Sequence, residues 1–155
     1  MEEADQITQN LEIVSLHYPA PAERACLSLV QGDVQKAARW VEERRLDDDD
    51  KPSYARELEY LVLARTLLNR NLSDRALSLL EHLEAGAKAQ ERVGSLIEIQ
   101  VLQALAFQAS GKADQAIKAL AQALMQAEPD GYIRICMEFW PKSGTLTYTF
   151  SQSLP

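Results

Sequence analysis

The side chains that most often carry chemistry are few and scattered in this chain. It has two histidines, His17 and His82, and two cysteines, Cys26 and Cys136. A metal site needs several such ligands at short spacings, and nucleophilic catalysis needs a base held beside the nucleophile. Neither arrangement occurs at helical spacing, so the sequence predicts a protein that is not an enzyme and that uses no metal or cofactor. Both cysteines lie among apolar neighbours, which favours buried thiols in a reducing compartment.

Composition and charge limit the class of protein. The chain has 155 residues, of which 46% are hydrophobic and 25% are charged, as is typical of one soluble globular domain. Its net charge of −7 argues against a surface that neutralises phosphates, so we expect no direct contact with nucleic acid. No apolar run approaches the roughly eighteen residues that a membrane helix needs, and the acidic start at Glu2, Glu3 and Asp5 is unlike a signal peptide. We therefore expect a cytoplasmic protein that does not bind membranes.

One pattern of small residues occurs three times. In each copy an alanine comes seven positions before a turn residue, and a second alanine comes five positions after it. The turn residues are 39 and then 40 positions apart, a period typical of helical repeat arrays. Small side chains let two helices cross closely, so each copy predicts an antiparallel helical hairpin. The copies are Ala25, Gly32 and Ala37; Ala64, Asn71 and Ala76; and Ala104, Gly111 and Ala116.

The hairpins predict an all-α fold, a superhelix of stacked antiparallel helical hairpins. We expect a single domain over residues 1–140, which begins with a helix over 2–18, and an extended or strand-like tail over 141–155. Within the domain, the repeat units lie at about 22–45, 54–90 and 92–128, with a partial unit from 131.

Turns and caps of the hairpins have recognisable residues. Gly32 and Gly111 can take the left-handed backbone that ends many helices, and Asn71 tolerates it. Asp33 and Ser73 have side chains suited to capping the N-termini of the helices that follow. The sequence therefore predicts short, tight turns inside the first two hairpins and a similar turn in the third.

The connection between the first and second units is acidic. Asp47, Asp48, Asp49 and Asp50 form a run of like charges, followed by Pro52, which cannot join an apolar helical stripe. We expect a solvated loop at this point in the chain.

The units resemble tetratricopeptide repeats. In that family a glycine lies in the middle of the hairpin, with a small residue seven positions before it and an alanine five positions after it. All three units keep both intervals, with a connection about five residues longer than in the usual repeat of about 34. The resemblance implies that the six alanines are the positions where helices cross.

A narrower resemblance covers Pro21 to Phe139, more than three quarters of the chain. Stretches such as LSLVQGDVQKAARWVEER, ELEYLVLARTLL and EPDGYIRICMEF look like the helical-repeat segment of the large LuxR-type, ATP-dependent transcriptional regulators related to the maltose activator MalT. In that family a nucleotide-binding switch domain precedes the repeats and a DNA-binding helix-turn-helix follows them. The repeats receive an inducer or a partner protein and bias the switch.

Parts of that family pattern are missing from this chain. No glycine-rich phosphate loop occurs, so ATP switching is not carried over, and neither is DNA binding. The pattern is lost after Trp140. We expect the chain to be either a fragment of such a regulator or a short protein derived from one.

The resemblance also implies a ligand groove. Tetratricopeptide hairpins line their concave surface with the leading helix of each unit, and the polar residues expected there are Arg65, Asn69, Glu98 and Gln108. A few hydrogen-bonding groups among apolar walls suit a peptide, a sugar or a small inducer. Alternatively, these are solvated side chains on an exposed face. The remaining positions expected on the groove are Cys26, Leu29, Val30, Leu58, Leu61, Leu68, Val101, Leu105 and Ala109.

The resulting prediction is a non-enzymatic sensor or protein-interaction module of a MalT-like regulator, which binds an inducer or a partner protein in the concave groove. The alternative is a free-standing scaffold or adaptor that binds a peptide or partner, and the residues alone do not separate the two. We expect Trp40 to pack in the core between hairpins. Near Trp140 an unfinished unit would expose apolar surface, so we also expect self-association through the C-terminal end.

Overall fold

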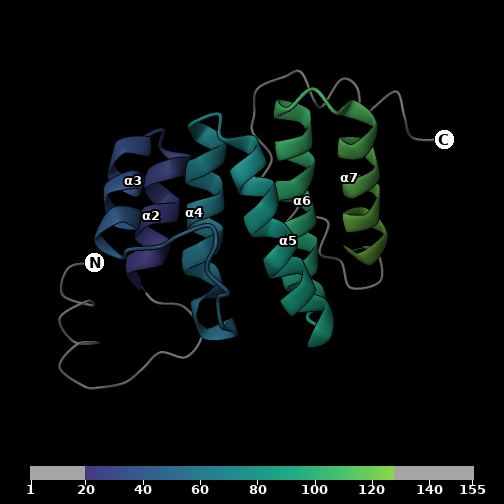
Figure 1. The fold of residues 1–155 in the computed structure, drawn as a ribbon, viewed down its shortest axis with the longest axis horizontal. Helices are drawn as coiled ribbons and strands as arrows, with labels where there is room; N and C mark the ends of the chain where they lie inside the picture. Colours follow the sequence, from purple (N-terminus) through teal and green to yellow (C-terminus); the bar gives the residue numbers. More distant parts are fainter. Residues whose placement is uncertain (1–19, 128–155) are drawn as a thin grey trace. The chain divides into compact units, whose positions relative to one another are not determined.

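Helices make up all the regular structure in the part of the chain that the structure, a computed structural model, describes, residues 20–127 (Figure 1). The predicted all-α fold is confirmed. The helix expected over 2–18, the partial unit from 131 and the tail over 141–155 lie outside the described residues. The elements are α2 (Ala20–Val30), α3 (Val34–Glu43), the short 3-10 helix η1 (Tyr54–Arg56), α4 (Glu57–Asn69), α5 (Ser73–Ala89), α6 (Val93–Ala109) and α7 (Ala113–Ala127).

The chain divides into two compact units. The boundary falls between Leu83 and Glu84, inside α5, so the first unit holds α2 to α4 with the beginning of α5. The second unit holds the end of α5 with α6 and α7. The extent of a single domain over residues 1–140, with its unit boundaries, stays a prediction.

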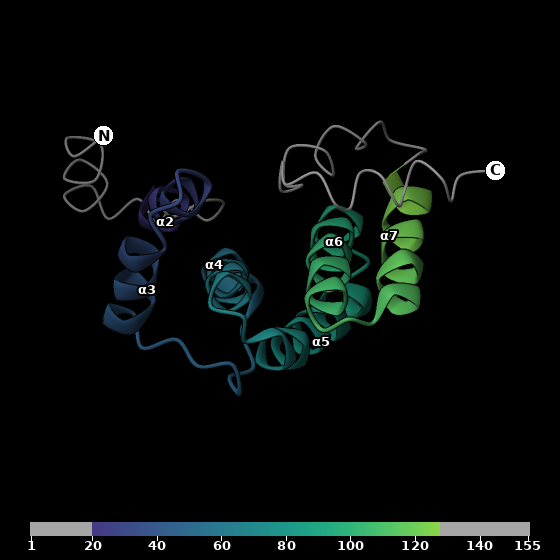
Figure 2. The ribbon, with the colours of Figure 1, turned by 90° about the horizontal axis from the view of Figure 1, so that it is seen from above.

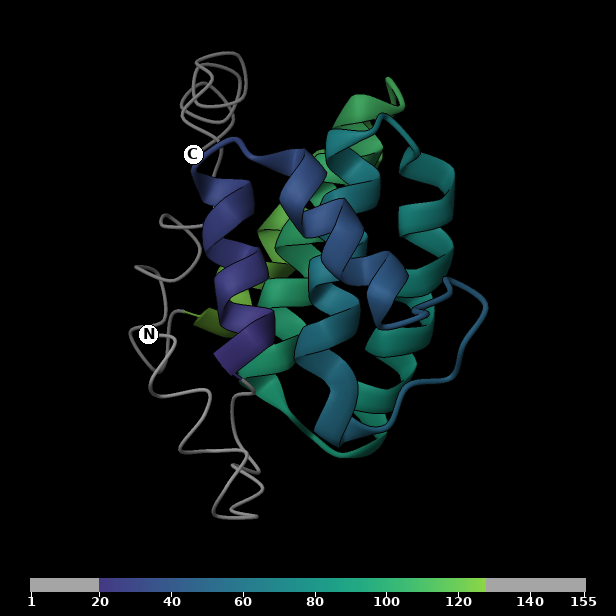
Figure 3. The same ribbon diagram turned by 90° about the vertical axis from the view of Figure 1, so that its left-hand side faces the viewer.

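Three helices of the first unit pack against one another. α2, α3 and α4 make pairwise contacts, and Figure 3 shows them together. The crossing positions predicted for this unit, Ala25, Ala37, Ala64 and Ala76, are at most 3% exposed, so small side chains do lie where the helices meet. α4 is buried on most of its faces and forms the centre of this unit.

The second unit is built on one antiparallel pair. α6 and α7 run side by side, joined by the turn at Gly111 (Figure 2). Ala104 and Ala116 are 2% and 3% exposed, which again confirms the predicted crossing positions. The core between the two helices consists of Ile97, Val101, Ala104, Ala119, Leu120, Ala123 and Ala127, with Phe107 and Leu124 packed against it.

The three predicted hairpin turns have the expected backbone. Gly32, Asn71 and Gly111 have φ values of 84°, 60° and 74°, all in the left-handed region. Two further residues share this conformation, Arg45 with φ 52° and Glu91 with φ 53°, although neither residue type favours it. Arg45 follows the end of α3 and Glu91 follows the end of α5, so they mark the connections between hairpins.

One hydrogen-bond pattern closes all of these turns. In each case the residue after the left-handed one donates its N–H to the carbonyl five positions earlier, which satisfies an orphan acceptor at the end of the helix. The N···O distances are 2.8 Å for Asp33 to Ser28, 3.3 Å for Leu46 to Val41, 2.9 Å for Leu72 to Leu67, 3.0 Å for Arg92 to Ala87 and 2.9 Å for Lys112 to Phe107.

One of the two predicted N-caps is confirmed and the other is not. The Asp33 side chain accepts a hydrogen bond from the Lys36 N–H at 3.1 Å, as an N-cap does. The prediction for Ser73 is wrong by one position, because Ser73 is already the first residue of α5 and Leu72 stands before the helix. The reason is that the turn at Asn71 has the same length as the turn at Gly32, which leaves only one residue before the helix.

Candidate functional site

Two predicted groove residues of neighbouring leading helices meet in the first unit. Arg65 on α4 and Cys26 on α2 occupy equivalent positions of successive repeats, and the Arg65 Nη1 lies 3.7 Å from the Cys26 Sγ, to which it donates. Both side chains are half-buried. α2 and α4 therefore present equivalent positions to one shared surface.

Asn69 and Val30 continue this surface toward the hairpin turns. They are also equivalent positions, at the last residues of α4 and α2, and both are exposed; Val30 is 79% exposed. The Asn69 Nδ2 donates to the carbonyl oxygen of Arg65 at 2.9 Å, so part of its hydrogen-bonding capacity serves the helix end. Two of the four polar residues expected in the groove, Arg65 and Asn69, thus lie one helical turn apart and in contact.

The other two polar groove residues, Glu98 and Gln108, belong to the second unit. Both lie on α6 and both are half-buried. The structure places them in a different compact unit from Arg65 and Asn69. A groove shared by all four residues stays a prediction.

Two apolar positions expected on the groove are buried instead. Leu61 is 3% exposed and Val101 is 2% exposed, and Val101 belongs to the core between α6 and α7. These two assignments were wrong because counting back from a turn residue gives the helix face but not the neighbours that cover it. The set of residues that can line the expected groove is therefore smaller than the sequence predicted.

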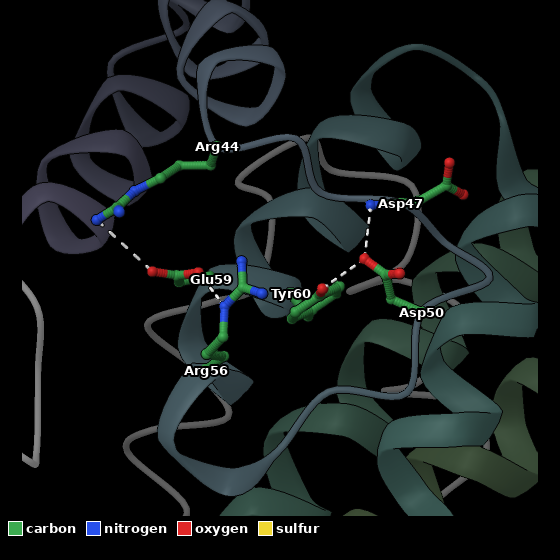
Figure 4. Close-up of polar contacts among 6 residues, drawn as sticks. All are labelled: Arg44, Asp47, Asp50, Arg56, Glu59 and Tyr60. Atoms are coloured by element: carbon green, nitrogen blue, oxygen red, sulfur yellow. Dashed lines mark hydrogen bonds and ion pairs between the residues drawn. The ribbon is translucent and has the colours of Figure 1, made fainter.

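A polar network lies at the beginning of α4 (Figure 4). The Glu59 carboxylate, 6% exposed as a residue, accepts from the Arg56 Nε at 2.9 Å and lies 3.6 Å from the Arg44 Nη2. Each arginine also stacks on an aromatic ring, with Arg44 5.7 Å from the centre of the Trp40 ring. Two guanidinium groups thus satisfy one buried carboxylate.

Tyr60 connects this network to the acidic connection. Its hydroxyl donates to the Asp50 Oδ2 at 2.6 Å, and the same oxygen accepts from the Asp47 N–H at 3.2 Å. Burial and, secondly, the bond to Asp50 raise the pKa of Tyr60 to about 12. The Tyr60 bond, with the Asp47 N–H, also lowers the pKa of Asp50 below its ordinary value.

The acidic run is only partly solvated, contrary to the prediction. Asp48 is 8% exposed and accepts from the Arg75 guanidinium on α5, with its Oδ2 2.9 Å from Nε and its Oδ1 bonded to Nη2. The hydrogen bond from Arg75 is the main reason why the pKa of Asp48 is lowered. Asp47 and Asp49 are exposed, as expected. The sequence could not reveal this pair because Arg75 is 27 positions away.

Trp40 is half-buried, and Arg44 lies over its ring. An arginine above an aromatic face gains from the cation–π interaction while its charge stays accessible to water. Trp40 therefore joins the polar network through Arg44, and its packing between hairpins stays a prediction.

The polar groups of this network bind one another and the backbone. Its carboxylates are occupied by arginines, a tyrosine and backbone N–H groups. Among residues 20–127, no three side chains of the His, Cys, Asp and Glu types are grouped so that they could bind a metal ion. In the same range, no helix combines the length and apolar character needed to cross a membrane.

Comparison with known proteins placed the chain beside one described family. The model of a family described as the MalT-like TPR region matches residues 1–138. Searches of curated proteins and of solved structures found no match. The match includes every helix of the described range and supports the resemblance drawn from the sequence.

Proposed function

This chain belongs to the MalT-like TPR region family, and from that membership we propose that it is the sensing and protein-interaction module of a MalT-like regulator of the LuxR type. Tetratricopeptide-type helical repeats are in general a non-catalytic, protein-binding fold. In this proposal an inducer or a partner protein binds to the surface formed by the leading helices, and no reaction is catalysed.

The contact between Cys26 and Arg65 is the observation that carries the proposal. A residue on α2 and its equivalent on α4 lie 3.7 Å apart, so the two leading helices line one surface. A ligand that lies across this surface touches two repeats at once. It can therefore respond to, and change, the arrangement of one hairpin against the next.

The chemistry of this surface supports a ligand with both apolar and hydrogen-bonding groups. Val30 supplies an exposed apolar side chain, and Leu29 and Leu68 are half-buried. Arg65 and Asn69 supply polar groups beside them. A small number of polar groups among apolar side chains is typical of sites that bind a peptide segment or a small molecule.

A thermal-shift screen of the full chain tests the proposal, because a ligand that binds only the folded state raises the melting temperature. The compounds are nucleotides, oligosaccharides and acyl-lactones, together with a library of short peptides. The screen is repeated with Arg65→Met, which removes the charge from the surface, and with Arg39→Met, which removes an exposed charge from the trailing helix α3.

We expect at least one compound that stabilises the parent chain and the Arg39→Met variant but not the Arg65→Met variant. A stabilising compound that acts equally on all three chains would place its binding elsewhere and contradict the proposal. If only peptides act, the adaptor alternative gains support over the sensing of a small inducer.

A further inference from the structure

α4 carries both the proposed ligand surface and the polar network of the first unit. Arg65, which contacts Cys26 of α2, lies in the second half of this helix, and Glu59 lies six positions before it. At a rise of about 1.5 Å per residue, the two positions are about 9 Å apart along the helix axis. A displacement of α4 as a whole therefore moves both sites.

The helix is built to move as one body. Nine of its 13 residues are buried, so its neighbours hold it along most of its length. Proline and glycine, the usual causes of a kink, do not occur within Glu57–Asn69. Closely packed helices shift between discrete arrangements rather than deforming gradually. A ligand that changes how α2 and α4 meet therefore displaces the start of α4 as well as its end.

The start of α4 holds the end of α3 and the acidic connection after it. The Glu59 carboxylate lies 3.6 Å from the Nη2 of Arg44, the C-cap residue of α3 (Figure 4). The buried Tyr60 donates to Asp50 at 2.6 Å, and Asp50 in turn accepts from the Asp47 N–H at 3.2 Å. The position of α4 therefore decides whether these contacts can form.

The acidic connection is the weakly held partner in these contacts. Its residues 46–53 contain no helix or strand, and Asp47 and Asp49 are exposed. Asp50 ties it to α4, and Asp48 ties it to Arg75 on α5. Segments with few buried contacts open at a low cost in free energy, and the elements that move in allostery are drawn from them. A shift of α4 is therefore expected to change the connection before it changes the packed helices.

We propose that the acidic connection responds to the ligand surface through α4, so that a ligand bound beside Arg65 changes how residues 47–50 are held. The proposal rests on the function proposed above, because it concerns regulation by the same surface. Coupling between two sites is reciprocal, so a change at the connection must also change the ligand surface. The coupling can therefore be measured without a ligand.

The first measurement probes the ligand surface while the connection is changed. In a full chain with Cys136→Ser, Cys26 is the only thiol, and its rate of reaction with an aromatic disulfide reports its accessibility. Tyr60→Phe is added to remove the bond to Asp50 while keeping the ring. Arg75→Met is the matched control, because it detaches the same connection from α5 and leaves its bond to α4 in place.

The second measurement probes the connection while the ligand surface is changed. Hydrogen exchange followed by mass spectrometry reports the opening of residues 47–50 in the full chain. Arg65→Met removes the group that donates to Cys26. Arg39→Met, which removes an exposed charge from α3, is the control.

We expect Tyr60→Phe to raise the reaction rate of Cys26 several-fold, and Arg75→Met to leave it at the parent value. Arg65→Met should speed the exchange of residues 47–50 several-fold, and Arg39→Met should leave it unchanged. Circular dichroism checks that each variant keeps its helices. If Tyr60→Phe loses them, the exchange measurement alone decides.

Two results would overturn the proposal. One is a folded Tyr60→Phe or Arg65→Met variant in which the probed site behaves as in the parent. The other is an equal effect of the control variants, because a general loss of stability would then explain the changes. A positive coupling result with a failed thermal-shift screen would reject the proposed function alone, and the reverse outcome would reject only the coupling.

Discussion

The two connections between hairpins begin with the same turn but differ in length and in the course of the chain after it. Residues 44–56 join α3 to α4 in the first unit, and residues 90–92 join α5 to α6 in the second. Both begin with the same turn, in which Arg45 or Glu91 takes the left-handed backbone. After that turn the first connection continues through the acidic run, whereas the second enters α6 at once.

The difference shows that a repeat of nearly constant length can be divided between helix and loop in two ways. α3 and α4 have 10 and 13 residues, whereas α5 and α6 have 17 each, although the turn residues stay 39 and 40 positions apart. In the second unit backbone hydrogen bonds of longer helices order the chain. In the first unit side-chain pairs, Asp48 with Arg75 and Asp50 with Tyr60, must order a longer loop against its conformational entropy.

The largest expected effect tests whether the helix crossings of the two units are packed equally tightly. Ala76→Leu in the first unit and Ala104→Leu in the second should each lower the free energy of unfolding by about 1–3 kcal/mol, because both alanines are buried at helix crossings. Urea denaturation measures the change. Ala85→Leu, at an exposed position of α5, is the control and should change little. Two crossing variants as stable as the parent would contradict the packing described here.

The next largest effect concerns only the connection between α3 and α4. Arg75→Met leaves the buried Asp48 carboxylate without its partner and should destabilise the chain by about 1 kcal/mol, a modest value because 55% of the Arg75 side chain is exposed and solvent screens the pair. High salt should reduce the difference. Gln115→Met, at the equivalent position of α7, is the matched control and should be neutral.

The acid dependence of that difference checks its cause. Arg75 lowers the pKa of Asp48 in the folded chain, so the pair stabilises the fold above the ordinary value of 3.8 and loses this contribution as the pH falls below it. Parent and Arg75→Met should therefore become equally stable in acid. A difference that stays constant down to about pH 2 would assign the effect to packing of the Arg75 stem.

A third effect, of opposite sign, tests what the two connections share. Arg45→Gly and Glu91→Gly should each raise the free energy of unfolding by about 0.5–1 kcal/mol, because glycine takes the left-handed backbone without steric cost. Thermal unfolding measures the gain. Gly32→Ala, at a turn that already has glycine, should lower stability instead. Destabilisation by both glycine variants would mean that the side chains of Arg45 and Glu91 matter more than the backbone.

The last effect appears only in alkali and again concerns the first unit. Tyr60 is neutral in the folded chain with a pKa of about 12, so the fold keeps this contribution below the ordinary value of 10 and loses it as the pH rises from 10 to 12. Tyr60→Phe should lose less stability than the parent between about pH 8 and about pH 11. Tyr54→Phe removes an exposed tyrosine and should behave like the parent.

Local signals were sufficient for much of this fold. The left-handed turns at Gly32, Asn71 and Gly111 follow from residue type, and the six buried alanines follow from a spacing repeated three times. The Asp33 cap depends only on the three residues after it. Cys26 and Arg65 were both expected on the groove by counting back from the turn residues, and the structure brings them into contact.

Contacts between distant residues were the part that sequence reasoning missed. Nothing near Asp48 indicates that it is paired with Arg75, and nothing near Tyr60 indicates that its hydroxyl bonds to Asp50. Arg45 and Glu91 were missed for a different reason, because the surrounding turn overrides their intrinsic preference. The network around Glu59 likewise had no sequence signal beyond the presence of charges near a helix start.

The shared turn geometry has a consequence for how such a chain can grow. Breaks placed at Arg45 and at Glu91 would have matching ends, because both residues have the same backbone conformation and each donates its N–H to the carbonyl three positions earlier. A gene duplication that copies the stretch between them would therefore splice one helix end onto another of identical form. Lengthening by whole repeats then requires no new turn to evolve.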